Sequence, residues 1–293
     1  MQPDMTLEAL QAIIIEVFPE LARARFGLLA AGWDSVAIDV DDALIFKFPR
    51  DEDAREGLIR EARLLAVIRP VVTMPVPDLE LFEQPRLFSR HLKLKGDHLL
   101  TPDYEQLPFL KRQLLAVGMA RFFAQLHVLD PAVMTQAGAA PIEPWPAPDE
   151  ILRRAVPLLP PQLQAYAERT VADWQDLPPD PYGATYGFFD GHGWNMAFDH
   201  DRDRLNGVYD FADSGFGPLH QEFVYPNFIA WDLTMRIIDE YEALTGRVID
   251  RNRVKLLTGV LRLAELAGEA DKMEQLPIML QSVADWAAVD AGR

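Results

Sequence analysis

A helical spacing of hydrophobic residues opens the chain. Between residues 5 and 25, apolar side chains recur three or four positions apart, at Leu7, Leu10, Ile13, Ile14, Val17 and Leu21, as they do along one face of a helix. Ser35–Val40 then alternates apolar with smaller or polar residues, and the run ALIFKFPR follows a turn at Asp41-Asp42. We expect these two runs to be neighbouring strands joined by a tight turn.

A lysine stands inside the second of these strands. Ala43, Ile45 and Lys47 share one face of it, and a buried ammonium is costly unless an anion meets it. In the helix predicted for 54–68, Glu61 lies on the apolar stripe that faces the protein. We therefore expect Lys47 and Glu61 to pair. Such a pair adds little stability, so it is better explained by an ammonium held over phosphates. The alternative is a lysine that reaches water at the strand end.

The second half of the chain is predicted to be mainly helical. A hinge is expected near Ser89–Gly96, followed by a long helix from Pro108 to about Leu129 with a core-facing stripe. His127, at the end of that helix, is interpreted as a buried structural histidine. The proline-rich stretch 141–161 is interpreted as a connecting segment. Three further helices are expected, at about 222–245, 250–268 and 272–288.

The stretch from Tyr186 to Pro218 holds the candidate chemistry. Asp190 precedes Asn195 by five residues in a segment rich in glycine and aromatic residues, and Asp210 follows an apolar run that is typical of a strand. Two carboxylates and one amide supply the oxygen ligands that Mg²⁺ prefers. The same order, an Asp, an Asn five residues later and an Asp-Phe pair downstream, is found in the catalytic loop and metal strand of kinases. The alternative is that Asp190 only caps a turn.

Composition narrows the classes of function. The chain of 293 residues is 49% hydrophobic and 25% charged, as globular proteins are, and it is long enough for two lobes with a core each. It has no cysteine, which excludes disulfides and thiolate chemistry. No basic residue precedes Arg23 and no apolar run is long enough to span a bilayer, so we expect a cytoplasmic protein without a membrane partner. A net charge of −17 argues against a nucleic-acid partner and would attract a cationic small molecule.

Together these motifs resemble the aminoglycoside phosphotransferase family, relatives of choline kinase and the protein kinases. The resemblance rests on AAGWDSVAIDV and IFKFPR for the nucleotide loop and its lysine, REARLL for the helix glutamate, FFDGHGWN for the catalytic loop and VYDFADSGFG for the metal strand. It implies a two-lobe, protein-kinase-like α+β fold. A small N-lobe with an antiparallel sheet (1–90) would bind the nucleotide, and a larger, mainly helical C-lobe (91–293) would carry the catalytic loop and the substrate-binding helices.

For the donor nucleotide, the resemblance implies four contact residues. Gly32 and Ser35 would belong to the loop at the phosphates, and Lys47, held by Glu61, would contact the α- and β-phosphates. Gly32 is the only clear glycine of that loop, so its backbone would cradle the phosphates less closely than the glycine-rich loop of a protein kinase. The sequence does not choose between ATP and GTP.

For the chemistry, the resemblance implies that Asp190 is the catalytic base and that Asn195 and Asp210 bind Mg²⁺. The implied activity is transfer of the γ-phosphate of ATP or GTP to a hydroxyl of a small cationic molecule, such as an aminoglycoside-like compound or an amino alcohol. Candidates for contact with this acceptor are His192, Asp213 and Glu222, with Asp232, Glu240 and Trp231 as further acidic or aromatic residues that could line its site.

Two other functions stay open. Phe188 and Phe189 precede Asp190 where the family has His-Gly or His-Asn. Together with the sparse glycines of the nucleotide loop, this favours as an alternative a catalytically inactive, kinase-like module that binds nucleotide without turning it over. A hydrolase with Asp190 and Asp210 as paired acids is a third hypothesis, and it would act without nucleotide or metal.

Overall fold

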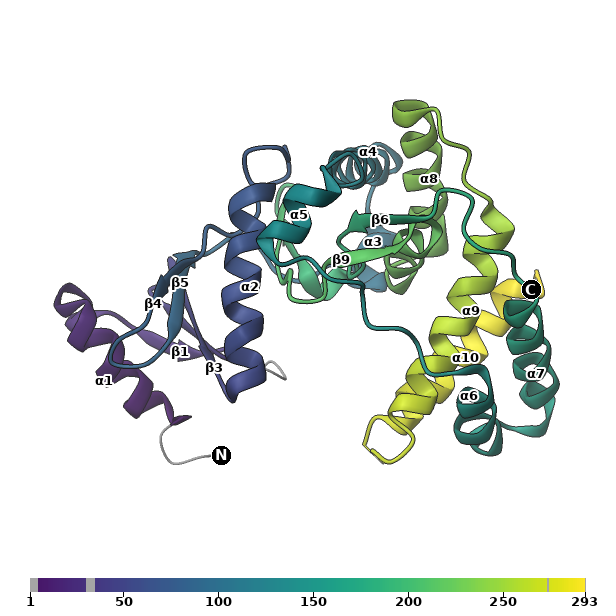
Figure 1. The fold of residues 1–293 in the computed structure, drawn as a ribbon, viewed down its shortest axis with the longest axis horizontal. Helices are drawn as coiled ribbons and strands as arrows, with labels where there is room; N and C mark the ends of the chain where they lie inside the picture. Colours follow the sequence, from purple (N-terminus) through teal and green to yellow (C-terminus); the bar gives the residue numbers. More distant parts are fainter. Residues whose placement is uncertain (1–4, 30–34, 273, 293) are drawn as a thin grey trace.

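The structure divides into two lobes (Figure 1). It is a computed structural model that describes residues 5–29, 35–272 and 274–292, so the predicted nucleotide-loop residue Gly32 lies outside the described residues. The N-lobe comprises α1 (Leu7–Val17), η2 (Pro19–Arg23), α2 (Glu52–Ile68) and the strands β1 (Phe26–Leu28), β2 (Ser35–Val40), β3 (Leu44–Pro49), β4 (Glu80–Phe82) and β5 (Phe88–Leu92).

The five strands form one antiparallel sheet in the order β1-β2-β3-β5-β4. At the turn between β2 and β3, Ala43 N donates to Val40 O at 3.0 Å, and Asp41 and Asp42 have φ angles of 56° and 54°. Two central residues with positive φ make the turn whose twist suits a hairpin. The predicted pair of strands and their turn are therefore confirmed. β5 continues to Leu92, past the predicted lobe boundary at residue 90.

The two faces of this sheet have different neighbours. α1 covers one face, where it packs against the aromatic residues Phe46, Phe48 and Phe88. Lys47 lies between Phe46 and Phe48 in β3 and therefore points to the opposite face. α2 stands between the sheet and the C-lobe (Figure 1), and it carries Glu61 toward that second face. The N-lobe thus buries its aromatic side under α1 and turns its lysine toward the rest of the molecule.

The C-lobe is mainly helical, as predicted. Its helices are α3 (Thr101–Gln106), α4 (Phe109–Leu126), α5 (Pro131–Ala137), α6 (Pro148–Ala155), η3 (Val156–Leu158), α7 (Pro161–Gln175), η4 (Gly193–Asn195), η5 (Leu219–Phe228), α8 (Trp231–Thr245), α9 (Arg251–Gly268) and α10 (Leu276–Asp290). Two short antiparallel sheets accompany them, β6 (Ala184–Gly187) with β9 (Gly215–Pro218) and β7 (Met196–Asp199) with β8 (Arg204–Val208). The candidate catalytic loop lies between β6 and β7, and Asp210 follows β8.

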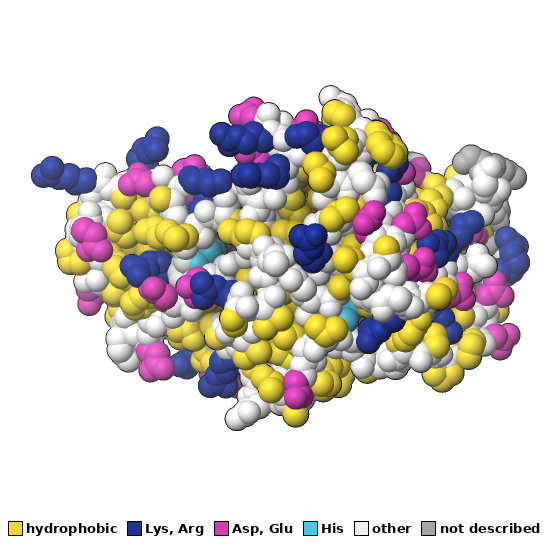
Figure 2. Space-filling view, turned by 90° about the horizontal axis from the view of Figure 1, so that it is seen from above, with side chains coloured by type: hydrophobic (Ala, Val, Ile, Leu, Met, Phe, Trp, Pro, Cys, Tyr) yellow, Lys and Arg dark blue, Asp and Glu magenta, His cyan; other side chains and the backbone are white. Residues whose placement is uncertain are grey.

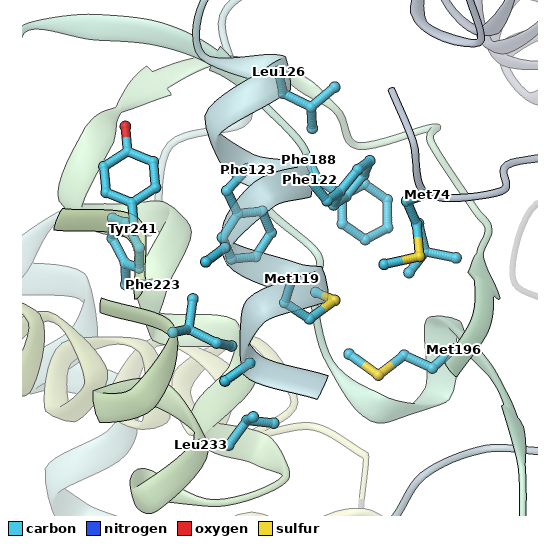
Figure 3. Packing of buried hydrophobic residues seen from close by; sticks show 14 of the residues in the cluster. Met74, Met119, Phe122, Phe123, Leu126, Phe188, Met196, Phe223, Leu233 and Tyr241 are labelled. Atoms are coloured by element: carbon cyan, nitrogen blue, oxygen red, sulfur yellow. The ribbon is translucent and has the colours of Figure 1, made fainter. Parts of the chain in front are cut away.

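α4 runs through the middle of the main apolar cluster (Figure 3). Tyr241 and Phe223 lie on one side of this helix, and Met74 and Met196 lie on the other. Phe122 of α4 also meets the ring of Phe188 at a centroid distance of 5.7 Å. The segment that leads into the catalytic loop therefore packs in the same core as the central helix of the lobe.

A second apolar cluster lies between α6, α7, α9 and α10. α6 begins at Pro148 and α7 at Pro161, and proline suits the first turn of a helix because the N–H it lacks would have no partner there. The interpretation of 141–161 as a connecting segment is therefore wrong for α6, and α7 has no counterpart among the predicted helices. These two helices give α9 a second core to pack against.

The charge of the molecule is not spread evenly over its surface. Figure 2 shows one face, on which Lys and Arg side chains line one edge of the half that holds the N-lobe, with acidic side chains scattered between apolar areas. The net charge of −17 therefore does not by itself locate a site for a cationic substrate. No helix in the described part of the chain is both long and apolar enough to cross a membrane.

Candidate active site

Lys47 contacts two carboxylates that are far apart in the sequence. Its Nζ lies 3.5 Å from Glu61 Oε2 on α2 and 3.4 Å from Asp210 Oδ1 after β8. The expected contact between Lys47 and Glu61 is therefore present. Burial alone would lower the pKa of Lys47, but the two carboxylates outweigh it and raise this pKa above its ordinary value. Lys47 is thus a permanent cation placed between the lobes.

Glu61 connects the lobes through both of its oxygens. Oε2 faces Lys47, and Oε1 accepts a hydrogen bond from Phe211 N at 3.0 Å. Its side chain is only 3% exposed, so both contacts are largely shielded from water. A single carboxylate therefore fixes the lysine of the N-lobe relative to the backbone that follows Asp210.

Asp190 is oriented by two side chains of its own loop. Asn195 Nδ2 donates to Asp190 Oδ2 at 2.5 Å, and His192 Nε2 lies 2.9 Å from Asp190 Oδ1. Both contacts come from side chains, whereas an aspartate that caps a turn accepts from backbone N–H groups. The Asp190 side chain is still 21% exposed. The carboxylate is therefore held in a defined direction while part of it stays open to solvent.

Backbone pairing brings Asn195 beside Asp210. Tyr209 N donates to Asn195 O at 3.0 Å, which continues the register of β7 and β8 so that Asp210 comes one residue after the position opposite Asn195. Asp210 has a φ angle of 69°, a left-handed conformation that is rare for residues other than glycine and is often found at functional sites. Its side chain is half exposed. The Asn195 amide nitrogen faces Asp190, and the amide oxygen and the Asp210 carboxylate are oxygen atoms of the kind that Mg²⁺ prefers.

Glu222 supports the catalytic loop from inside the protein. Its side chain is fully buried in η5, and its two oxygens accept from Phe188 N and Phe189 N, each at 2.9 Å. His127 Nε2 lies 3.3 Å from Glu222 Oε2, and His127 Nδ1 lies 2.8 Å from Tyr241 OH. The prediction that Glu222 contacts the acceptor does not fit this burial, because both oxygens are used by the loop backbone. His127 is buried and structural, as expected.

Phe188 occupies the place of the family histidine and packs in the core. Its ring lies 4.7 Å from that of Phe211, and the next residue, Phe189, turns the chain toward Asp190 with a φ angle of 51°. Gly187 is required beside this turn, because a Cβ there would lie 2.1 Å from Glu222 Oε2. Aromatic packing and the buried carboxylate therefore hold the loop in place of a histidine side chain.

A carboxylate that sequence reasoning missed lies near Asp190. Glu265 of α9 has a buried Oε2 with no hydrogen-bond partner among the described residues. Burial raises the pKa of Glu265 to about 7, although Arg262 beside it acts in the opposite direction, and the charges of His192 and Asp190 also reach it. No signal in the sequence marks Glu265 as buried rather than exposed on a helix surface, because its surroundings depend on how α9 packs in the folded protein.

Aromatic rings connect α9 to that loop. The Arg262 guanidinium lies 3.6 Å from the ring centroid of Phe228, and Phe228 in turn lies 6.2 Å from Trp194 and 6.1 Å from His192. Trp194 stands between Asp190 and Asn195 in the sequence and is 47% exposed. We call the set Trp194, Phe228, Arg262 and Glu265 the acceptor wall.

The other predicted acceptor residues lie in different surroundings. Asp232 forms an ion pair with Arg236 at 2.9 Å, and Glu240 accepts from Gln113 of α4 at 2.7 Å. Tyr104 OH of α3 also donates to Asp232 Oδ2 at 2.6 Å, so both acids connect α8 to a neighbouring helix, and their place at a substrate site stays a prediction. Asp213 is exposed in the turn after Phe211, and Ser35 is the first residue of β2. Their roles at acceptor and nucleotide remain predictions.

Solved structures share this two-lobe fold. The GDP complex of wild-type aminoglycoside 2′-phosphotransferase-IIIa is similar over 98% of this chain and 100% of that chain, with a TM-score of 0.82 and 20% identity. A GDP and kanamycin complex of APH(2″)-IIIa is similar over 97% and 99%, with a TM-score of 0.78 and 18% identity. Macrolide 2′-phosphotransferase MphH from Brachybacterium faecium is similar over 92% and 97%, with a TM-score of 0.64 and 16% identity.

These likenesses establish the fold, a kinase-like α+β arrangement with a small sheet lobe and a helical lobe, as predicted. No curated protein matches the chain. A family model described as "Phosphotransferase enzyme family" matches residues 26–257. This range covers most of the sequence and includes Lys47, Asp190, Asn195 and Asp210. The chain therefore belongs to the phosphotransferase enzyme family.

Proposed function

We propose that the protein transfers the γ-phosphate of ATP or GTP to a hydroxyl of a small cationic molecule. The observation that supports this proposal is the ion pair of Lys47 with Asp210, whose neighbour Tyr209 is hydrogen-bonded through its backbone to Asn195, the partner of Asp190. An ammonium for phosphates, oxygen ligands for a cation and a carboxylate for a proton are thereby brought together. These groups are the main requirements of enzymatic phosphoryl transfer, because positioning and charge stabilisation supply most of the rate enhancement.

The residues present fit a magnesium ion. Asp210 offers a half-exposed carboxylate. Asn195, the last residue of η4 directly before β7, offers an amide oxygen. Mg²⁺ is usually held by one or two protein oxygen ligands, with waters and substrate phosphates completing its shell. We assign this pair, one carboxylate and one amide oxygen, as the protein ligands of the ion. When bound, Mg²⁺ would neutralise charge on the phosphates.

In the proposed reaction, Asp190 is the proton acceptor. The acceptor hydroxyl gives its proton to the carboxylate, its oxygen forms a bond to the γ-phosphorus, and the bond between that phosphorus and the β–γ bridging oxygen breaks. The nucleoside diphosphate leaves with that oxygen. His192 and Asn195 keep the carboxylate aimed, and Lys47 faces the phosphate charge from the N-lobe.

The acceptor wall supports a cationic acceptor. Glu265 Oε2 makes no hydrogen bond among the residues described and lies 3.8 Å from Arg262 Nη1, and Trp194 supplies a partly exposed ring within the catalytic loop. An ammonium would pair with such a carboxylate, and the face of an aromatic ring attracts cations as well. A hydroxylated amine whose ammonium contacts Glu265 and Trp194 would bring a hydroxyl close to Asp190, because Trp194 belongs to the same loop as Asp190.

A phosphorylation screen tests the proposal. The full-length protein is incubated with Mg²⁺ and either ATP or GTP, against a panel of aminoglycosides and amino alcohols, and nucleoside diphosphate and phosphorylated product are both measured. We expect product with at least one amine-bearing acceptor and none when Mg²⁺ is removed by a chelator. Nucleotide binding without any transfer would support the inactive module, and activity without nucleotide or metal would support the hydrolase.

The pH dependence of stability tests the burial of Glu265. Folded Glu265 keeps its proton up to about pH 7, whereas the unfolded chain releases it near the ordinary value of 4.5. The folded state therefore holds more protons between these values, and the free energy of unfolding falls as pH rises, by at most about 1.4 kcal/mol per pH unit for this one group.

We expect the Glu265→Gln variant to gain stability relative to the unaltered protein between pH 5 and 7, as measured by urea unfolding. The exposed Glu168→Gln variant is the control, and an identical pH profile for both variants would contradict the prediction.

A further inference from the structure

Arg60 of α2 reaches from the N-lobe to the backbone that follows Asp210. Its Nη2 donates to Ala212 O at 3.1 Å. The stem of the side chain runs past Gly138, the residue at the C-terminal end of α5, where a Cβ would lie 3.3 Å from Arg60 Cγ. Arg60 is half-buried, and it contacts the C-lobe with both its stem and its guanidinium.

Two successive residues of α2 hold the same turn. Glu61 Oε1 accepts from Phe211 N at 3.0 Å, which fixes the peptide group that follows Asp210. Arg60 holds the carbonyl of the next residue, Ala212. Both contacts involve a charged side chain, and such hydrogen bonds are stronger than neutral ones. The Phe211-Ala212 pair is therefore held at both ends from the N-lobe.

The C-lobe holds this turn at a different atom. Ser214 N and Ser214 Oγ both donate to Phe211 O, at 3.1 and 2.6 Å. Tyr186 OH of β6 donates in turn to Ser214 Oγ at 2.9 Å. These contacts close the turn and tie it to β6. Because they do not involve Ala212 O, the guanidinium of Arg60 adds a restraint that they do not duplicate.

Asp210 has a backbone conformation that depends on such restraints. Its φ angle of 69° is rare for a residue with a Cβ, and it persists only where the surrounding structure fixes it. Its side chain is half exposed and contacts Lys47 at 3.4 Å, so packing covers only part of the carboxylate. The direction of this carboxylate therefore depends on the adjoining backbone, which is held from α2.

We propose that Arg60 is a positioning residue for Asp210. By holding Ala212 O, it keeps Asp210 in its left-handed conformation before a metal ion or a nucleotide binds. A ligand group that is already in place loses less freedom on binding, which raises the affinity. Arg60 itself touches neither the ion nor the phosphates. This inference rests on the proposed function, in which Asp210 binds Mg²⁺ beside the nucleotide.

Hydrogen exchange in the protein without metal or nucleotide tests the restraint. NMR follows the amide of Phe211, which donates to Glu61, and the amide of Phe123 in α4. Arg60→Met keeps an apolar stem and loses the donor, and Arg63→Met makes the same change at an exposed position of α2. We expect Arg60→Met to speed exchange at Phe211 at least about tenfold, as the loss of a hydrogen bond from a charged group allows, and to leave Phe123 unchanged. Arg63→Met should change neither amide.

Nucleotide binding tests the consequence for the metal. The affinity for the β,γ-imido analogues of ATP and GTP is measured by calorimetry with Mg²⁺ and with a chelator, and the ratio gives the gain due to the metal. We expect this gain to be roughly three- to tenfold smaller in Arg60→Met, because affinity falls with the fraction of molecules in which Asp210 is correctly placed. Arg63→Met should keep the full gain. The affinity in chelator should be the same for all three proteins, because Lys47 is untouched.

Each outcome has a distinct meaning. Unchanged exchange at Phe211 in Arg60→Met, equal acceleration at Phe211 and Phe123, or an unchanged gain from Mg²⁺ would overturn the role of Arg60. Absence of any gain from Mg²⁺ in the unaltered protein would instead contradict the proposed function, on which the exchange result does not depend. If Arg60→Met does not fold, Arg60→Gln, whose shorter side chain loses the reach to Ala212 O, takes its place with the same expectations.

Discussion

Replacement of Asp190 by asparagine is expected to lower kcat by roughly 10²–10⁴, the usual contribution of a positioned general base. The two side chains have nearly the same shape, so the contacts from Asn195 and His192 that orient residue 190 can largely persist. What is lost is the ability to take the proton of the acceptor hydroxyl. Initial rates of product formation with an acceptor identified in the screen provide the measurement.

Two controls accompany this measurement: the Mg-nucleotide affinity of the variant and the kcat of Asp201→Asn. Mg-nucleotide affinity should stay within a few-fold of that of the unaltered protein, because Lys47 and Asp210 are untouched. Asp201→Asn makes the same chemical change at an exposed position in the turn between β7 and β8, and it should leave kcat unchanged. A kcat for Asp190→Asn close to that of Asp201→Asn would show that Asp190 is not the base.

Replacement of Glu222 by alanine is expected to reduce both stability and turnover. The substitution leaves Phe188 N, Phe189 N and His127 Nε2 without the oxygens that they face in a fully buried place. Each buried donor left unpaired costs about 1–3 kcal/mol, so a total loss of several kcal/mol in the free energy of unfolding is expected. The backbone just before Asp190 loses its anchor at the same time, and kcat should fall with it. Urea unfolding and steady-state kinetics measure the two effects.

The same experiment distinguishes support of the loop from contact with the substrate. A residue that touches the acceptor would raise KM for the acceptor and leave the melting temperature unchanged, whereas a loop support lowers kcat and the melting temperature together. Asp213→Ala is the comparison, since Asp213 is exposed and was grouped with Glu222 as an acceptor residue on sequence grounds. An unchanged melting temperature for Glu222→Ala would contradict the role assigned to it here.

Local patterns predicted the strand pair of the N-lobe and the contact between Lys47 and Glu61. The alternation in Ser35–Val40 and the run around Lys47 specify two strands because side chains repeat every two residues along a strand. Glu61 was expected to face Lys47 because a charge on the apolar stripe of a helix needs a partner. Asp190, Asn195 and Asp210 were recognised by spacing. In the structure Asp190 contacts Asn195, and Asp210 contacts Lys47.

Features that depend on long-range packing could not be predicted in this way. Glu222 and Glu265 are both helix acids in the sequence, yet one is buried under the loop backbone and the other is close enough to Asp190 for that charge to act on it. Only the fold determines which helix face meets which loop, so spacing within a helix does not separate the two roles. α6 was missed for a local reason, because Pro148 marks a helix start as readily as it marks an irregular segment.

Helix α9 is anchored in two places, and this has a consequence for how the protein can change over time. Val254, Leu257 and Leu261 belong to the core around α4, whereas Val260, Leu263 and Leu266 belong to the cluster with α6, α7 and α10. In the proposed acceptor site, a substitution at Glu265 would change the charge that an acceptor meets while two separate cores hold the backbone of α9 in place. The proposed site could therefore take different acceptors over time while Lys47, Asp190 and Asp210 stay unchanged.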